Sequence, residues 1–193
     1  MTTANKVTIL RILLIPLFVV AVLYYVDTGN EKFRLAALVA FLVAAVCDGV
    51  DGFIARHYHQ VSELGKLLDP LADKLLLVSG VVLLSMNHGP RLERLPLWLV
   101  ATILSRDVLL LIGLGVMHLV RGKMDIVPRI SGKIATVFQM ATVVWALLKW
   151  DAQWLFLLTL GAALFTGVSG LFYGWDWMRQ MSTHPTSLAT VKK

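Results

Sequence analysis

Six long and almost entirely apolar stretches make up most of this 193-residue chain. They cover residues 7–26, 33–54, 67–87, 96–120, 130–149 and 153–175. A helix needs about 20 predominantly apolar residues to cross the hydrocarbon core of a bilayer, and each stretch is close to that length. Hydrophobic residues make up 58% of the chain and charged residues only 16%, a composition typical of membrane proteins. We therefore expect an all-α integral membrane protein with six transmembrane helices.

The length is that of one domain, so we assign residues 1–193 to a single membrane domain. Its last residues, from about 181 to 193, are polar, and we expect a mobile tail there. The breaks between the apolar stretches contain turn-forming segments such as "DTGNEK" and "NHGPRLERLP". A single cysteine, Cys47, excludes a framework of intramolecular disulfides.

Lysine and arginine are unevenly divided between the two sides that six crossings create. The side with both termini holds Lys6, Arg11, Arg56, Lys66, Lys74, Arg121, Lys123, Arg129, Lys133, Arg179, Lys192 and Lys193. The other side holds Lys32, Arg34, Arg91, Arg94 and Lys149. Since cytoplasmic loops carry the excess of basic residues, we expect a multi-pass protein of the cell (inner) membrane with both termini cytoplasmic. The net charge of +6 then indicates anionic headgroups and phosphate-bearing substrates, and no nucleic acid.

Four aspartates interrupt the apolar pattern where the second stretch ends and the third begins. Asp48 and Asp51 are three residues apart, and Asp69 and Asp73 are four apart, so each pair shares one helix face. A short loop between antiparallel helices would bring the pairs together at the cytoplasmic ends of helices 2 and 3. Carboxylates that close repel one another at low dielectric, so they require a positive partner.

Two kinds of positive partner fit these residues. Arg56, Lys66 and Lys74 are near enough in the sequence to form ion pairs with the aspartates. Alternatively, hard divalent cations such as Mg²⁺, Mn²⁺ or Ca²⁺ prefer oxygen ligands, and two such ions suit a phosphoryl displacement. A cation transporter also binds ions through intramembrane carboxylates, but usually near the midplane. The acids here gather at one membrane face beside Arg56, which favours a metal-dependent enzyme.

The aspartates belong to a longer pattern, Asp48-x2-Asp51-Gly52-x2-Ala55-Arg56-x8-Gly65-x3-Asp69-x3-Asp73. It resembles in full the signature of the CDP-alcohol phosphotransferase family, at eight positions within residues 48–73. The segment "NKVTILRILLIPLF" looks like the first helix of that family. "SRDVLL" and "SGKIATVFQM" resemble the fourth and fifth helices of its branch of phosphatidylglycerophosphate synthases and CDP-alcohol cardiolipin synthases.

The resemblance implies a six-helix enzyme, usually a homodimer, that moves a substituted phosphate from a CDP-linked donor to an alcohol and releases CMP. By position, Asp48, Asp51 and Asp69 would bind two divalent ions, Mg²⁺ or Mn²⁺. Asp73 would contact the second ion and act as the base. The residues implied to line the CDP site are Asp48, Asp51, Gly52, Ala55, Arg56, Gly65 and Asp69.

The donor implied by this branch is CDP-diacylglycerol, whereas the acceptor is inferred from basic residues. Arg106 lies inside the fourth apolar stretch, where a charge is costly and should face the interior with a partner. Asp107 adjoins it, but sequence neighbours do not share a helix face. Arg106, Lys133, Arg129 and Arg11 can form a pocket for an acceptor phosphate, which favours sn-glycerol 3-phosphate. Headgroup contact is the alternative for Arg129 and Arg11.

Two departures from the pattern of the phosphatidylglycerophosphate synthases keep another acceptor open. Those synthases commonly carry Arg-Glu where this chain has Arg106 and Asp107, and often a second lysine where it has Ala135. Arg-Asp and "SGKIAT" also resemble cardiolipin synthases, whose acceptor is phosphatidylglycerol. Inositol phosphate and serine are further alternatives. We expect glycerol 3-phosphate because a phosphate-bearing acceptor best explains an intramembrane arginine.

Overall fold

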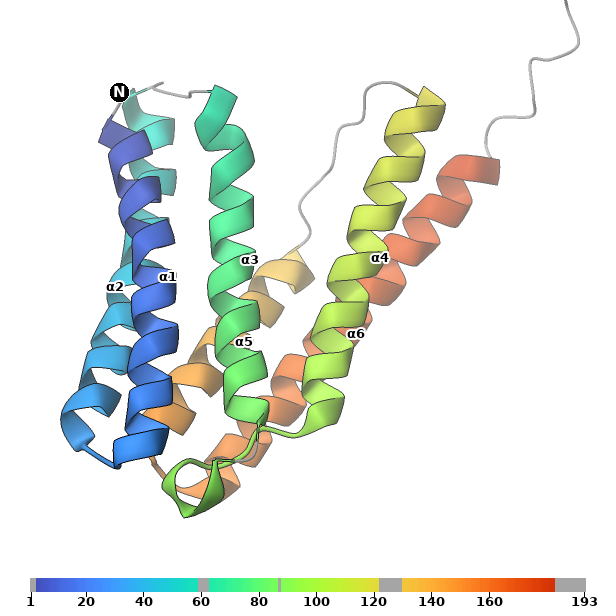
Figure 1. The fold of residues 1–193 in the computed structure, drawn as a ribbon. Coiled ribbons are helices and arrows are strands. Elements are labelled where there is room, and N and C mark those ends of the chain that lie inside the picture. The colour runs from blue at the N-terminus through green and yellow to red at the C-terminus, as the bar shows by residue number, and fades with distance from the viewer. Residues whose placement is uncertain (1–2, 59–62, 87, 122–129, 183–193) are drawn as a thin grey trace, which may run out of the picture.

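The computed structural model describes residues 3–58, 63–86, 88–121 and 130–182. These residues form six α-helices and one short 3₁₀ helix (Figure 1). The elements are α1 (Thr3–Thr28), α2 (Glu31–Tyr58), α3 (Glu63–Ser85), η1 (Gly89–Arg91), α4 (Leu97–Arg121), α5 (Ile130–Leu148) and α6 (Ala152–Ser182). The all-α prediction is confirmed for the described part of the chain. The expected polar tail lies outside it, apart from the last turn of α6.

Among the described residues, three helices are long and apolar enough to cross a membrane by length and composition, over Ile9–Thr28, Ile130–Leu148 and Ala152–Asp176. Large apolar side chains cover the outside of the bundle, and Leu111 and Leu171 are 69% and 77% exposed. A soluble monomer rarely exposes large contiguous apolar patches, whereas lipid tails accept such a surface. The chain is therefore built as a membrane protein.

Several helices extend further than the apolar pattern predicted, and two of these extensions bear on the aspartates. α2 continues to Tyr58 instead of ending near residue 54, and α3 begins at Glu63 instead of near residue 67. The added residues are polar, so hydrophobic length alone could not reveal them. The aspartates consequently lie inside the two helices, more than one turn from the end of α2 and from the start of α3.

Successive helices run in opposite directions, so the start of one helix lies near the end of the previous one (Figure 1). The start of α1, the end of α2, the start of α3 and the ends of α4 and α6 lie toward one end. We call this the aspartate end, because Asp48, Asp51, Asp69 and Asp73 are found in this half of α2 and α3. The opposite end, where α1 turns into α2, is called the distal end.

The turn from α1 to α2 shows why α1 ends and α2 begins where they do. Gly29 adopts φ +71°, a left-handed conformation that glycine accepts readily, and its N–H donates to the Tyr25 carbonyl at 2.8 Å. The Asn30 side chain then accepts the N–H of Lys32 at 3.1 Å, which is a helix N-cap contact. The sequence "DTGNEK" thus contains both the stop and the start signal.

Polar contacts close the distal end of the bundle. Arg91 donates to the carbonyls of Val26 and Asp27, and so satisfies the last turn of α1. Arg34 donates to the Leu147 carbonyl of α5 at 2.7 Å. Its hydrogen bond to Glu31 lowers the pKa of that carboxyl. These contacts connect α1, α2 and α5 to the segment after α3.

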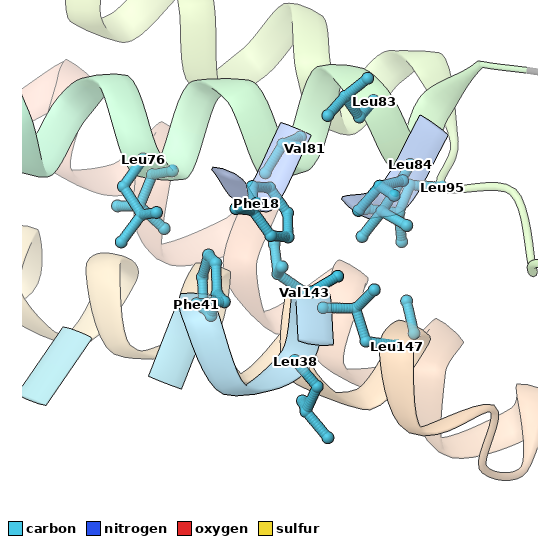
Figure 2. Close-up of a cluster of buried hydrophobic side chains, with 14 of the residues drawn as sticks. Phe18, Leu38, Phe41, Leu76, Val81, Leu83, Leu84, Leu95, Val143 and Leu147 are labelled. Atoms are coloured by element: carbon cyan, nitrogen blue, oxygen red, sulfur yellow. The ribbon is translucent and has the colours of Figure 1, made fainter. Parts of the chain in front are cut away.

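The apolar core lies in the distal half and contains side chains from all six helices (Figure 2). Phe18 of α1 and Phe41 of α2 meet there with ring centroids 5.5 Å apart. Val143 of α5 also belongs to this core, beside α3. The buried core side chains that Figure 2 labels are Phe18, Leu38, Phe41, Leu76, Val81, Leu83, Leu84, Leu95, Val143 and Leu147.

Buried polar side chains lie further toward the aspartate end. Gln139 of α5 donates to the Thr166 hydroxyl of α6 at 2.8 Å, and both side chains are buried. Such interhelical hydrogen bonds hold helices together where lipid gives no hydrophobic drive for association. A buried polar contact therefore joins α5 and α6 in addition to their apolar packing.

We predict that two glycines on α6 respond differently to alanine. A Cβ at Gly161 would lie 2.9 Å from the Phe138 ring, whereas one at Gly167 would meet no atom within 4 Å. Phe138 also stacks on Phe165, so its ring cannot move freely. Gly161→Ala should lower the thermal midpoint of the detergent-solubilised protein, since overpacking costs about 1–3 kcal/mol. Gly167→Ala, the control, should leave the midpoint unchanged or raise it. Equal midpoints would contradict this packing.

Candidate active site

The backbone brings the four aspartates to one end of two adjacent helices. Asp48 and Asp51 lie on α2, and Asp69 and Asp73 on α3. The side chains of Asp48, Asp51 and Asp69 lie outside the described residues, as do those of Ala55 and Arg56. Asp73 is half-buried. The backbone thus agrees with the arrangement expected from the spacing, while the predicted ligand geometry stays a prediction.

No group of three or more His, Cys, Asp or Glu side chains suited to a metal is present among the residues that were described. The side chains of three of the four aspartates lie outside these residues, so the metal site stays a prediction. Gly52 and Gly65 of the signature likewise lie on helices whose surroundings are not described at those positions.

Arg11 lies at the same level of the bundle as Asp48. α1 and α2 are antiparallel, and Phe18 contacts Phe41. Two helical turns toward the aspartate end, about seven residues, lead to Arg11 on α1 and Asp48 on α2. The Arg11 side chain is completely buried, with 0% exposed. Headgroup contact is therefore the wrong interpretation for Arg11, because no surface of this side chain reaches lipid.

Arg106 of α4 is buried among three helices, as expected for an intramembrane arginine. One terminal nitrogen, Nη2, lies 3.4 Å from the Ser169 hydroxyl of α6. The guanidinium also lies 5.8 Å from the centre of the Tyr173 ring, within the range of a cation–π contact. A Cβ at Gly132 of α5 would come within 3.1 Å of Nη2. At this glycine α5 therefore passes close to the guanidinium.

Asp107 is a partner of Arg106, although sequence neighbours were not expected to meet. Its Oδ1 accepts a hydrogen bond from Arg106 Nη1 at 2.8 Å. The expectation was wrong because it considered only the direction of each Cβ, whereas the long arginine side chain reaches around the helix. The two side chains are only 10% and 14% exposed, so the pair is shielded from solvent.

Lys74 of α3 completes the same cluster. Its ammonium nitrogen lies 2.7 Å from Asp107 Oδ1 and 2.9 Å from Oδ2. Lys74 had been considered as an ion-pair partner for the signature aspartates, and the structure shows that it pairs with Asp107 of α4. One carboxylate thus faces two cations, so this cluster of Lys74, Arg106 and Asp107 carries a net charge of +1. An excess positive charge in a shielded place suits an anionic ligand.

The predicted acceptor pocket stays a prediction. Lys133 is exposed, Arg129 lies outside the described residues, and Arg11 is on another helix than Arg106. Ala135, the position of the second lysine in related synthases, is buried with 1% exposed. Sequence reasoning missed Ser169 and Tyr173 as neighbours of Arg106. Their spacing of four residues on α6 was the available signal, since it places a hydroxyl and a ring on one face.

Comparison with known proteins shows the family to which the chain belongs. A family model described as CDP-alcohol phosphatidyltransferase matches residues 1–168. A Bacillus subtilis (strain 168) protein named CDP-diacylglycerol--glycerol-3-phosphate 3-phosphatidyltransferase is 35% identical over 148 residues, covering 72% of this chain and 72% of that protein. An Escherichia coli (strain K12) protein of the same name is 33% identical over 140 residues, covering 72% and 73%. The chain therefore belongs to the CDP-alcohol phosphatidyltransferase family, as its signature predicted.

We predict that the ring of Tyr173 stabilises the buried guanidinium. Tyr173→Phe keeps an aromatic face toward Arg106, whereas Tyr173→Leu removes it, and a cation–π contact is worth about 0.5–2 kcal/mol. The thermal midpoint of the purified protein should fall for Tyr173→Leu and stay near the wild-type value for Tyr173→Phe. Equal losses in both variants would assign the stabilisation to the hydroxyl instead.

Proposed function

We propose that this enzyme transfers the phosphatidyl group of CDP-diacylglycerol to sn-glycerol 3-phosphate, giving phosphatidylglycerophosphate and CMP. The relatives described above carry the name of this reaction. The observation in the structure that supports it most is the net positive, shielded cluster around Arg106. It supplies a place for the acceptor phosphate in the same half of the bundle as the signature aspartates.

Two sequence differences, at Asp107 and at Ala135, favoured a cardiolipin synthase, and the contacts of Asp107 weaken the first of them. Asp107 keeps a carboxylate that pairs with Arg106 and Lys74, as a glutamate at that position also could. Ala135 remains a difference, since a small buried residue occupies the position of a second lysine. Phosphatidylglycerol is therefore the alternative acceptor, and the assay below distinguishes the two.

The signature residues fit a pair of divalent ions, Mg²⁺ or Mn²⁺, held by Asp48, Asp51, Asp69 and Asp73. Lys74 directs its ammonium to Asp107, which favours metal ions over this lysine as counter-charges for the aspartates. When bound, such ions would neutralise the donor pyrophosphate and the charge on the departing CMP. Gly52, Ala55, Arg56 and Gly65 would line the CDP site.

Asp73 would accept the proton of the acceptor hydroxyl while that oxygen attacks the β-phosphorus of the donor. The bond from this phosphorus to the CMP oxygen breaks in the same displacement. Arg106 would hold the acceptor phosphate meanwhile, so that the hydroxyl stays in line. We further propose that all six helices cross the membrane, that both termini and the aspartate end are cytoplasmic, and that the enzyme is a homodimer.

The acceptor can be identified with purified protein, labelled CDP-diacylglycerol and Mg²⁺. Glycerol 3-phosphate, phosphatidylglycerol, inositol phosphate and serine are offered separately. Label should appear in phosphatidylglycerophosphate, and EDTA should abolish the transfer because the aspartates lose their counter-charge. Label found only in cardiolipin would establish the alternative acceptor. If no CMP were released with any of the four acceptors, the proposed function would be overturned.

Asp73→Asn tests the proposed base with little change of volume. Turnover should fall by a factor of about 10²–10⁴, the usual contribution of a general base, while the protein remains folded and membrane-bound. Asp27→Asn is a matched control, since Asp27 is exposed at the distal end and should leave turnover unchanged. Near-normal turnover of Asp73→Asn would remove the assigned role.

A further inference from the structure

An ion pair joins the residue that follows the proposed base to the residue that follows the buried arginine. Lys74 follows Asp73 on α3, and Asp107 follows Arg106 on α4. The Lys74 ammonium contacts both oxygens of the Asp107 carboxylate, at 2.7 Å and 2.9 Å. This α3–α4 ion pair therefore connects the helix that would hold the base with the helix that would hold the acceptor phosphate.

We propose that the α3–α4 ion pair positions the acceptor by setting the distance between Asp73 and Arg106. Lys74 and Asp107 are then positioning residues, and the assignment rests on the function proposed above. In glycerol 3-phosphate the attacking hydroxyl and the phosphate belong to one small molecule, so their separation is limited. The base and the phosphate site must match that separation for the hydroxyl to be deprotonated as it attacks.

The packing of the two helices explains why an ion pair is needed here. α4 packs mainly against α6, while α3 packs mainly against α1 and shares little surface with α4. The two helices diverge toward the aspartate end (Figure 1). Apolar contacts of α4 with the core, through Leu99 and Ile103, lie nearer the distal end. At the level of Asp73 the Lys74–Asp107 contact is therefore well placed to limit their separation.

The surroundings make this contact stronger than an ordinary surface ion pair. The Asp107 side chain is 14% exposed and that of Lys74 is 38% exposed, so solvent screens the pair less than two exposed charges. Arg106 keeps Asp107, Ser169 and Tyr173 as neighbours if Lys74 is removed. A change at Lys74 thus separates the helices without releasing the arginine.

The test compares Lys74→Met, Asp107→Asn and the double variant in the transfer assay. A displacement of about 1 Å in a catalytic arrangement can cost roughly 100-fold. We expect kcat/KM for glycerol 3-phosphate to fall by about 10- to 100-fold in Lys74→Met, while KM for CDP-diacylglycerol stays constant. The double variant should be no worse than Asp107→Asn alone, because the same contact is lost. Lys74→Arg should restore most of the activity.

Lys149→Met is the matched control, since it removes a Lys–Glu ion pair of 3.8 Å at the distal end, and its kcat/KM should be that of the wild type. Thermal midpoints of all variants separate positioning from stability, because loss of a purely structural contact would lower the midpoint and impair the use of both substrates together. Unchanged kcat/KM in Lys74→Met, or effects that multiply in the double variant, would overturn the positioning role. Failure of the wild type to use glycerol 3-phosphate would instead overturn the proposed function.

Discussion

A charged side chain inside an apolar bundle needs a partner of opposite charge, and the clearest example in this protein is Asp107. Its carboxylate accepts from Arg106 of the same helix and from Lys74 of α3. Without it, two cations would face each other in a shielded place, where repulsion is strong. Asp107 thus joins α4 to α3 through Lys74 and accepts a hydrogen bond from the Arg106 guanidinium.

The same requirement divides the bundle into two halves with different tasks. The distal half contains the apolar core and the close contacts of Phe18 and Phe41, and its ends are fixed by capping contacts of Arg91 and Arg34. The other half contains Arg11, Arg106, Asp73 and Lys74. A rigid apolar half allows the polar half to hold charges at defined positions, which a displacement reaction needs.

Much of the fold followed from the sequence, and the errors have identifiable causes. The six helices matched the six apolar stretches, because hydrophobic length is a strong signal in membrane proteins. The end of α2 was placed too early and the start of α3 too late, because the turns on both sides of the loop between them are polar. Arg11 was allowed a headgroup contact because its burial depends on packing between helices, which the sequence does not contain. Arg106 was expected to have a partner, but adjacency was taken to exclude Asp107.

The sequence by itself determined the helices, the family and the pairing of aspartates on two helix faces, because these depend on spacing along one chain. Only the tertiary structure decided that Lys74 meets Asp107, that Arg106 lies between Gly132, Ser169 and Tyr173, and that Lys133 is exposed. Such contacts depend on how helices tilt and how far long side chains reach, and no periodicity within a single helix contains that information.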